Sequence, residues 1–314
     1  MNCCVTTENE QKIQVLLSTY NGEIYIREQL DSILNQKGVS VHIIIRDDGS
    51  TDNTICIIKE YRKKYGDSVI HIIEGNNLGF AQSYYELVKF SGDYNYFSFC
   101  DQDDVWDNDK LLIGIENLKK IKCQETPNTY FCNCQLVDEK LNPLGKMYEN
   151  LQLTNRKIGS LLENRAAGCT MIFNKIARNM FLRGNFDKIL YHDHWIFVIC
   201  SYLGTVIYDN NTHILYRQHS NNQIGSKPTF KKIWNQRKKQ LKRKNYHPRE
   251  YMAQELLNNF KSKFNDDEIL LLAIFAEYRT NTLSKLKMLL NRNIKMSSAK
   301  KYFWFVIHVL IGNV

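Results

Sequence analysis

Apolar positions along the chain follow two spacings, and their alternation predicts the order of the elements. Short apolar runs predict buried strands, and apolar residues three or four positions apart predict amphipathic helices. The predicted strands cover 13–19, 41–45, 69–73, 94–99 and 129–134. The predicted helices pass through Ile26–Leu34, Ile55–Tyr65, Phe80–Phe90 and Asp107–Ile121. Strands that alternate with helices predict an α/β fold, with a mostly parallel sheet and right-handed crossovers.

The second half of the chain is less regular. A strand is predicted at 167–173, a helix follows Asp193, and a short β pair covers 205–208 and 214–217. Residues 255–290 have helical character, and the strongly apolar run 300–311 falls short of the roughly 20 residues that span a membrane. We therefore expect a domain over 1–225, with halves at about 12–135 and 136–225, and a helical C-terminal region over 226–314.

Composition narrows the class of protein. With 314 residues, of which 43% are hydrophobic, the chain can bury a sizeable core. The formal net charge of +9 is unevenly distributed, because the run from Lys227 to Arg249 is basic and contains no acidic residue. Such a run indicates a solvated helix face, an anionic membrane surface or nucleic acid as its environment.

Cysteine usage and the N-terminus suggest a reducing compartment. The nine cysteines are irregularly spaced, and no second close pair accompanies Cys132 and Cys134 in a zinc-binding pattern. We interpret them as small buried hydrophobic residues. The first eleven residues lack the basic and apolar regions of a signal peptide, so a cytoplasmic location is expected.

Three carboxylates lie in the four residues Asp101-Gln102-Asp103-Asp104, directly after a predicted buried strand. Carboxylates this close repel one another and are costly to desolvate. A divalent cation such as Mg²⁺ or Mn²⁺ would remove that cost. The alternative is an acidic turn that caps the next helix. Open α/β sheets bind ligands at strand ends, which favours the metal interpretation.

A second pair of carboxylates, Asp47 and Asp48, follows the second predicted strand. Gly49 permits a tight turn, and Ser50 or Asp52 can cap the next helix. The segment is therefore either an ordinary strand-to-helix turn or part of a ligand crevice.

The segment His192-Asp193-His194 resembles a zinc motif only superficially. On a helix the two histidines would lie about 200° apart, so they cannot readily share one metal. Asp193 is then either a helix N-cap or a carboxylate that faces the crevice.

Four motifs together resemble a known family. Ser18–Gly22, Asp47–Asp52, Asn77–Gly79 and Asp101–Asp104 are similar, in order and interval, to the nucleotide-sugar half of family-two inverting glycosyltransferases, which have the GT-A fold. The resemblance covers roughly residues 12–225. Asp101–Trp106 looks most like the bacterial rhamnosyltransferase-like branch, which builds surface polysaccharide.

The resemblance implies roles for individual residues. Asp193 aligns with the general base, and Asp101 and Asp103 match the metal-binding DxD element, with Asp103 in direct contact and His219 as a further ligand of Mn²⁺ or Mg²⁺. Ala167 and Gly168 would leave space for the donor sugar, and Trp195 would pack beneath a sugar ring or fill the core. The residues implied in nucleotide-sugar binding are Thr19, Tyr20, Asn21, Asp47, Asp48, Asn77, Asp101, Gln102, Asp104 and Arg217.

The expected activity is transfer of one sugar from a UDP- or dTDP-sugar, such as dTDP-L-rhamnose or another nucleotide-linked hexose, to a glycan or lipid-linked acceptor. The chain lacks the Gln-x-x-Arg-Trp element of processive synthases, which favours single transfer. The basic and apolar C-terminal region predicts a peripheral contact with the inner face of the cell membrane, or a helix that packs on a partner subunit.

Two rival classes fit less well. Nucleic-acid binding would suit the basic run, but the aspartate clusters would repel phosphate. A nucleotidyltransferase would carry a basic residue in the loop after the first strand, and Thr19-Tyr20-Asn21-Gly22 has none. We therefore expect no nucleic-acid partner, and the oligomeric state stays open.

Overall fold

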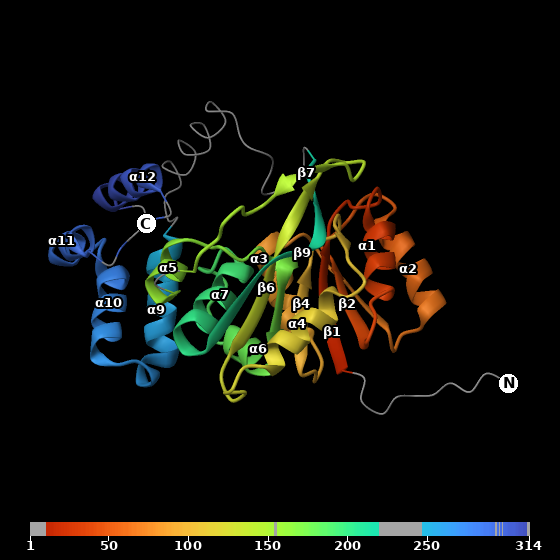
Figure 1. The fold of residues 1–314 in the computed structure, drawn as a ribbon, viewed down its shortest axis with the longest axis horizontal. Helices are drawn as coiled ribbons and strands as arrows, with labels where there is room; N and C mark the ends of the chain where they lie inside the picture. The colour runs from red at the N-terminus through yellow and green to blue at the C-terminus, as the bar shows by residue number, and fades with distance from the viewer. Residues whose placement is uncertain are drawn as a thin grey trace.

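A mixed sheet runs through the molecule and is covered by helices on both faces (Figure 1). The computed structural model describes residues 11–153, 156–219, 247–292, 294, 296 and 298–312. The nine strands are β1 (Gln11–Thr19), β2 (Val39–Asp47), β3 (Ile70–Glu74), β4 (Tyr96–Cys100), β5 (Val105–Trp106), β6 (Asn128–Val137), β7 (Pro143–Lys146), β8 (Met171–Asn174) and β9 (Thr205–Arg217). Their order in the sheet is β3-β2-β1-β4-β8-β6-β9-β5, and β7 pairs with β6.

The helices agree with the predicted periodicity wherever that was strong. In the first half they are α1 (Ile26–Leu34), α2 (Thr54–Tyr65), α3 (Phe80–Phe90) and α4 (Lys110–Lys119). The others are α5 (Arg156–Leu162), α6 (Lys175–Phe181), α7 (His192–Leu203), α9 (Pro248–Phe260), α10 (Asp266–Glu277), α11 (Thr282–Leu290) and α12 (Ala299–Leu310), with short 3₁₀ turns at Gly168–Thr170 and Lys261–Lys263.

Strand direction divides the sheet into two parts. Strands β3, β2, β1 and β4 are parallel, which confirms the predicted βαβ order. Strand β8 then runs antiparallel to both β4 and β6, so the sheet as a whole is mixed. The carboxyl ends of β1, β2 and β4 therefore lie along one edge, and the aspartate motifs follow directly from these ends.

Side chains of the strands alternate between two apolar cores. On β1, Leu16 belongs to one core, while Val15 and Leu17 belong to the other. Helices α1, α2 and α4 complete the second core, and α3, α5, α6 and α7 complete the first. Buried residues of α9 to α12, such as Leu256 and Phe305, join that first core, so the C-terminal helices share its packing.

Three predicted features differ from the structure. The predicted β pair at 205–208 and 214–217 is one long strand, β9, which pairs in parallel with β6 through a register shift near Cys132. The predicted strand at 167–173 begins as a 3₁₀ turn. The N-cap of α2 is Asn53, and Asp52 instead accepts a bond from the Thr54 backbone N–H at 3.0 Å.

Two predictions concern residues that are wholly or partly outside the described chain. The domain boundary at 225 lies outside it, as does the basic run up to residue 246. Among the described helices, none has the length and apolar character needed to cross a membrane. Among the described cysteines, Cys132 and Cys134 are buried free thiols, as predicted, whereas Cys56 and Cys123 are exposed, so the prediction is wrong for these two.

Candidate active site

A single large cleft follows the carboxyl ends of β1, β2 and β4 and has a volume of about 1220 Å³. Ten of the residues predicted for catalysis, nucleotide-sugar binding or metal binding line it: Thr19, Tyr20, Asn21, Asp48, Asn77, Asp101, Gln102, Asp103, Asp193 and His219. Asp47, Asp104 and Arg217 lie behind this wall. The structure thus brings most of the motifs together around one space.

Asp47 fixes the loop that follows β1 at the cleft. Its carboxylate accepts hydrogen bonds from the Thr19 hydroxyl at 3.0 Å and from the Ser50 backbone N–H at 2.8 Å. The Ser50 hydroxyl in turn accepts a bond from the Asn21 N–H at 2.9 Å. Asp47 therefore joins the ends of β1 and β2 and lies buried behind the wall of the cleft.

Asp48 fixes the second loop. Its carboxylate forms a buried ion pair with Arg46 and accepts the backbone N–H groups of Leu78 and Gly79, at 2.8 and 2.9 Å. This anchors the turn that begins with Asn77. Gly49 has a φ of +81°, and a Cβ there would lie 3.3 Å from the Asn77 nitrogen. A glycine therefore suits both the backbone conformation and the close approach of the two loops.

Gln102 closes the loop after β4 against the loop after β1. Its side-chain oxygen accepts the Tyr20 N–H at 2.8 Å, and its amide group donates to the Tyr20 carbonyl at 3.0 Å. This two-point clamp holds Asp101 and Asp103 on either side of Gln102 at the cleft.

The surroundings of Asp101 disfavour the ionised form of its carboxyl group. Burial, and then the nearby Asp103 charge, raise its pKa to about 7, although a hydrogen bond from the Tyr84 hydroxyl at 2.8 Å counters the rise. A cation in contact with this group would relieve the cost of ionising it.

Asp103 and His219 meet directly across the cleft, with 2.7 Å between the His219 Nε2 and a carboxylate oxygen. The His219 ring stacks on Tyr25 at 5.2 Å between ring centres, which fixes its plane. Two residues predicted as metal ligands, 116 positions apart, therefore share one location.

The oxygen ligands near Asp101 suit a divalent cation. Ligand atoms of Asp101, Asp104 and Cys169 lie within 4.8 Å of one another. The Asp104 Oδ2 is buried and has no hydrogen-bond partner within the described chain. Burial raises the pKa of the Cys169 thiol well above its usual value, which leaves the carboxylates as the hard ligands that Mg²⁺ and Mn²⁺ prefer.

Arg217 has a different position from the one predicted. Arg217 is only 2% exposed. Its guanidinium group pairs with Glu28 and donates to the Asp103 backbone carbonyl at 2.9 Å. Its backbone N–H also donates to Asp104 at 3.1 Å. Arg217 thus supports the acidic loop from behind and does not reach the cleft as a phosphate ligand.

Asp193 lines the same cleft and lies in the first turn of α7. It is 7% exposed, and burial raises its pKa to about 6, while hydrogen bonds from the His194 N–H, the Asn164 side chain and the Gly168 N–H oppose the rise. Tyr191 is the N-cap, so the alternative of Asp193 as the cap is wrong. A buried carboxylate with a pKa near neutrality is suited to accept a proton.

Gly168 and His192 hold the start of α7 in place. The His192 ring stacks on Tyr84 at 3.7 Å, and burial lowers its pKa well below the usual value. A Cβ on Gly168 would lie 2.8 Å from the His192 Nε2 and 3.4 Å from the Asp193 Cβ. Gly168 is therefore required by its contact with α7, and it also leaves room in the cleft.

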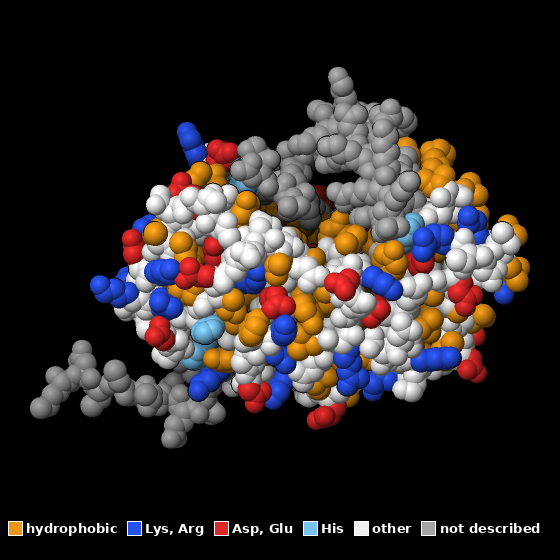
Figure 2. Space-filling view, turned by 180° about the vertical axis from the view of Figure 1, so that it is seen from behind, with side chains coloured by type: hydrophobic (Ala, Val, Ile, Leu, Met, Phe, Trp, Pro, Cys, Tyr) orange, Lys and Arg blue, Asp and Glu red, His pale blue; other side chains and the backbone are white. Residues whose placement is uncertain are grey.

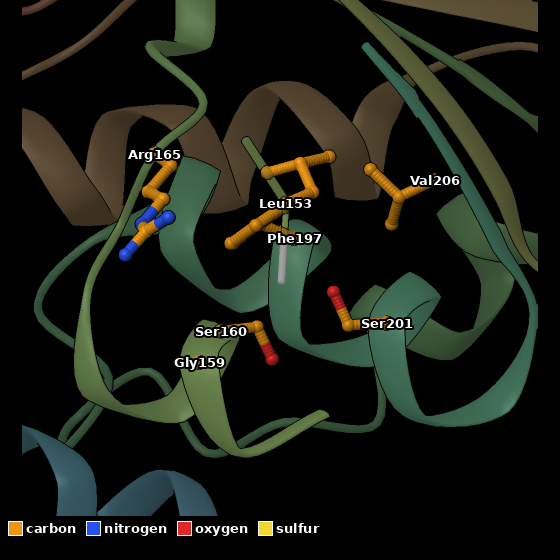
Figure 3. Close-up of a pocket in the computed structure, with 7 residues that line it drawn as sticks. All are labelled: Leu153, Gly159, Ser160, Arg165, Phe197, Ser201 and Val206. Atoms are coloured by element: carbon orange, nitrogen blue, oxygen red, sulfur yellow. The ribbon is translucent and has the colours of Figure 1, made fainter. Parts of the chain in front are cut away.

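The remaining aromatic and cavity features are structural. Trp195 fills the core, where its indole N–H donates to the Phe181 carbonyl at 3.2 Å, so it does not pack beneath a sugar. A second cavity behind α7, lined by Ser160, Ser201 and neighbours (Figure 3), has a volume of only about 10 Å³. That is about the space of one water molecule, too small for a nucleotide.

Sequence reasoning missed several residues of the site. Tyr84 and Tyr25 support the acidic loop, and Lys110 lies buried beneath it with its Nζ 3.5 Å from the centre of the Trp106 ring. Asn164 contacts Asp193. Each occupies an otherwise ordinary helix or loop position, so only the spatial neighbourhood identifies it.

Comparison with known proteins shows the family to which the chain is similar. Residues 14–181 match Glycosyl transferase family 2. The dTDP-rhamnosyl transferase RfbG of Shigella flexneri is 33% identical over 228 residues, which cover 68% of this chain and 75% of that protein.

Two solved structures resemble the fold. The structure of S. aureus TarS 1-349 has a TM-score of 0.58 at 15% identity, covering 97% of this chain and 81% of that one. The mannosyltransferase PcManGT of Pyrobaculum calidifontis, in complex with GDP-Man and Mn²⁺, has a TM-score of 0.51 at 14% identity, covering 98% and 88%. With its α/β fold of GT-A type, the chain belongs to glycosyl transferase family 2.

Proposed function

We propose that this protein is a metal-dependent, inverting glycosyltransferase that moves a single sugar, with rhamnose from dTDP-rhamnose as the first candidate. The observation that carries the proposal is the cleft itself. The acidic loop around Asp103 lines one wall and Asp193 the other. An inverting transfer needs both a site for the leaving diphosphate and a base for the acceptor hydroxyl. The similarity to RfbG supports the choice of sugar.

The donor half would bind the nucleotide through the loops that Asp47 and Asp48 fix. Thr19, Tyr20 and Asn77 line this part of the cleft. Asp101 and Asp103, with His219, would hold Mn²⁺ or Mg²⁺, and Asp104 would add a buried charge behind them. When bound, the metal would neutralise the charge that grows on the leaving nucleotide.

Asp193 would act on the acceptor. Its carboxylate takes the proton of the acceptor hydroxyl as the hydroxyl oxygen bonds to the anomeric carbon and the bond to the diphosphate breaks. The hydrogen bonds from the His194 N–H and Asn164 orient the carboxylate, and the neutral His192 next to it adds no competing charge.

The C-terminal helices suit a peripheral membrane contact, which would bring the enzyme to a lipid-linked acceptor of surface polysaccharide synthesis. Figure 2 shows hydrophobic side chains gathered at its upper right, over these helices. The exposed large hydrophobic residues in and next to α10, α11 and α12 are Leu270, Leu283, Leu286, Leu290, Tyr302, Phe303, Leu310 and Ile311. Lysines of α11 and α12, including Lys287 and Lys300, lie among them in the sequence. Apolar and cationic side chains together are typical of an interfacial surface.

The direct test is a donor screen. Purified protein is incubated with dTDP-rhamnose and with UDP-linked hexoses, each with Mn²⁺, Mg²⁺ or EDTA, and nucleotide release is measured. We expect release from one donor class with metal, a loss of at least about 100-fold with EDTA, and a similar loss in Asp103→Asn. The matched control is Asp187→Asn, an exposed aspartate outside the cleft. No binding or turnover of any donor would refute the proposal.

A further inference from the structure

The cleft continues beyond Asp193 and ends against a helix from the other end of the chain. Lys301, Trp304, Phe305 and His308 of α12 line this part. Their spacing of three, one and three residues places them on one face of the helix. Pro248 and Arg249, at the start of α9, line the same region. The wall that faces the proposed base is therefore built by the C-terminal helices.

Three consecutive residues connect this wall to Asp193. Leu162 accepts a hydrogen bond from the Arg249 Nε at 2.9 Å through its carbonyl. Glu163 pairs with the Lys301 Nζ at 3.2 Å, and Asn164 hydrogen-bonds Asp193. The junction at 162–164 therefore fixes α9, α12 and the proposed base relative to one another, as an acceptor site adjacent to the base requires.

The chemistry of the wall indicates its ligand. Lys301 and Arg249 provide cationic groups, His308 provides a ring nitrogen, and Trp304 provides an amphipathic ring of the kind that packs on sugars. The opposite face of α12 carries Phe303 and Leu310, seven residues apart and 60% and 58% exposed. One helix thus has a polar and aromatic face in the cleft and an apolar face outside.

We propose that α12 forms the acceptor subsite, and that the acceptor is a sugar carried on a lipid diphosphate. The sugar packs against Trp304, the diphosphate meets Lys301 and Arg249, and the lipid follows the apolar face of α12 into the membrane. This inference rests on the proposed function and specifies its acceptor. It also gives a reason for the combination of cationic and apolar residues in the C-terminal region of this chain, whose formal net charge is +9.

The test measures binding rather than turnover, so it does not depend on the identity of the donor. The probe is decyl diphosphate below its micelle concentration, titrated calorimetrically into the full-length protein. Two reference ligands are inorganic diphosphate and decyl maltoside. The variants are Lys301→Ala and Trp304→Ala, with Lys301→Arg as the conservative version. Lys119→Ala, an exposed lysine of α4 outside the cleft, is the matched control.

We expect decyl diphosphate to bind about tenfold more weakly to Lys301→Ala and to Trp304→Ala, and with unchanged affinity to Lys119→Ala. Lys301→Arg should retain most of the affinity. Circular dichroism and a melting curve check that each variant is folded. Equal affinity in all variants would overturn the proposal, as would a loss of affinity caused by Asp103→Asn, which would place the probe in the donor half.

The reference ligands test the lipid component. Inorganic diphosphate that binds as tightly as decyl diphosphate would overturn the lipid assignment. Decyl maltoside that binds as tightly would overturn the diphosphate assignment. Failure of the donor screen, in contrast, would show as absent nucleotide turnover whatever the probe binding. The two failures are therefore distinguishable.

Discussion

The two walls of the cleft are built in different ways. The wall that we propose to bind the donor, the donor wall, consists of loops that follow adjacent parallel strands, and short polar motifs fix them through bonds such as those of Asp48 to Leu78 and Gly79. The wall that we propose to bind the acceptor, the acceptor wall, is assembled from the end of α5, the 3₁₀ turn at Gly168, α7 and α12, which are distant in sequence. The donor wall is thus specified by local motifs, whereas the acceptor wall depends on how separate helices pack.

If the two walls have separate tasks, replacing Asp193 should abolish transfer and leave donor binding intact. Asp193→Asn removes the proton acceptor but retains the shape of the side chain, so we expect transfer to fall by roughly 10²–10⁴-fold. Single-turnover transfer and calorimetric donor affinity measure the two effects. Asp187→Asn serves as the control because it changes the same charge at an exposed site. A parallel loss of donor affinity would contradict the division.

The donor wall should fail in a different way, by loss of stability. Asp48→Ala leaves Arg46 buried without its partner, so we expect the free energy of unfolding to fall by about 3–5 kcal/mol. Asp67→Ala breaks an exposed pair with Arg62 and should cost about 0–1 kcal/mol. Urea denaturation compares the two. Equal small effects would show that the ion pair of Asp48 is not what holds the loop.

The contrast between the walls explains what could be predicted from sequence. The strands β1 to β4 and the residues at their ends were predictable, because apolar runs and turn residues lie next to one another in the chain. The direction of β8 and the single long β9 were not, because they depend on pairing with β6. The polar residues Asp209 to Asn211 look like a turn in sequence, yet they continue the strand.

Site residues follow the same rule. His219 and Asp103, for which the resemblance implied a metal role, lie in contact, although nothing in the local sequence connects them. Arg217 was expected at the phosphates, but Glu28, in α1, binds its guanidinium behind the acidic loop. Trp304 and Lys301 carried no recognisable signal, because only the packing of α12 brings them to the cleft.

On the acceptor wall, Gly168 tests whether packing alone positions the proposed base. In Gly168→Ala the new Cβ would meet the His192 ring, which Tyr84 holds from the other side. We expect α7 to shift at its start and transfer to fall by about 10- to 100-fold, with donor affinity nearly unchanged. Transfer rates and donor titrations measure both quantities.

The double variant His192→Ala/Gly168→Ala is the matched control for this contact, because it removes the opposing ring. Compared with His192→Ala alone, the glycine change should then cost little. If Gly168→Ala is equally damaging in both backgrounds, the contact with His192 is not its cause.

The smallest expected effect is the pH dependence of kcat/KM, which tests the proposed base without any mutation. Burial raises the pKa of Asp193 to about 6, so the ionised form that accepts a proton is lost as pH falls through 6. At saturating metal, which favours the ionised form of Asp101, kcat/KM should fall by about tenfold for each pH unit below 6. The neighbouring histidines do not confuse the profile, because burial lowers the pKa of His194 to about 4 and that of His192 well below its usual value. A profile that is flat between pH 5 and 8 would mean that Asp193 is not the titrating base, and the acceptor wall would then lack its proton acceptor.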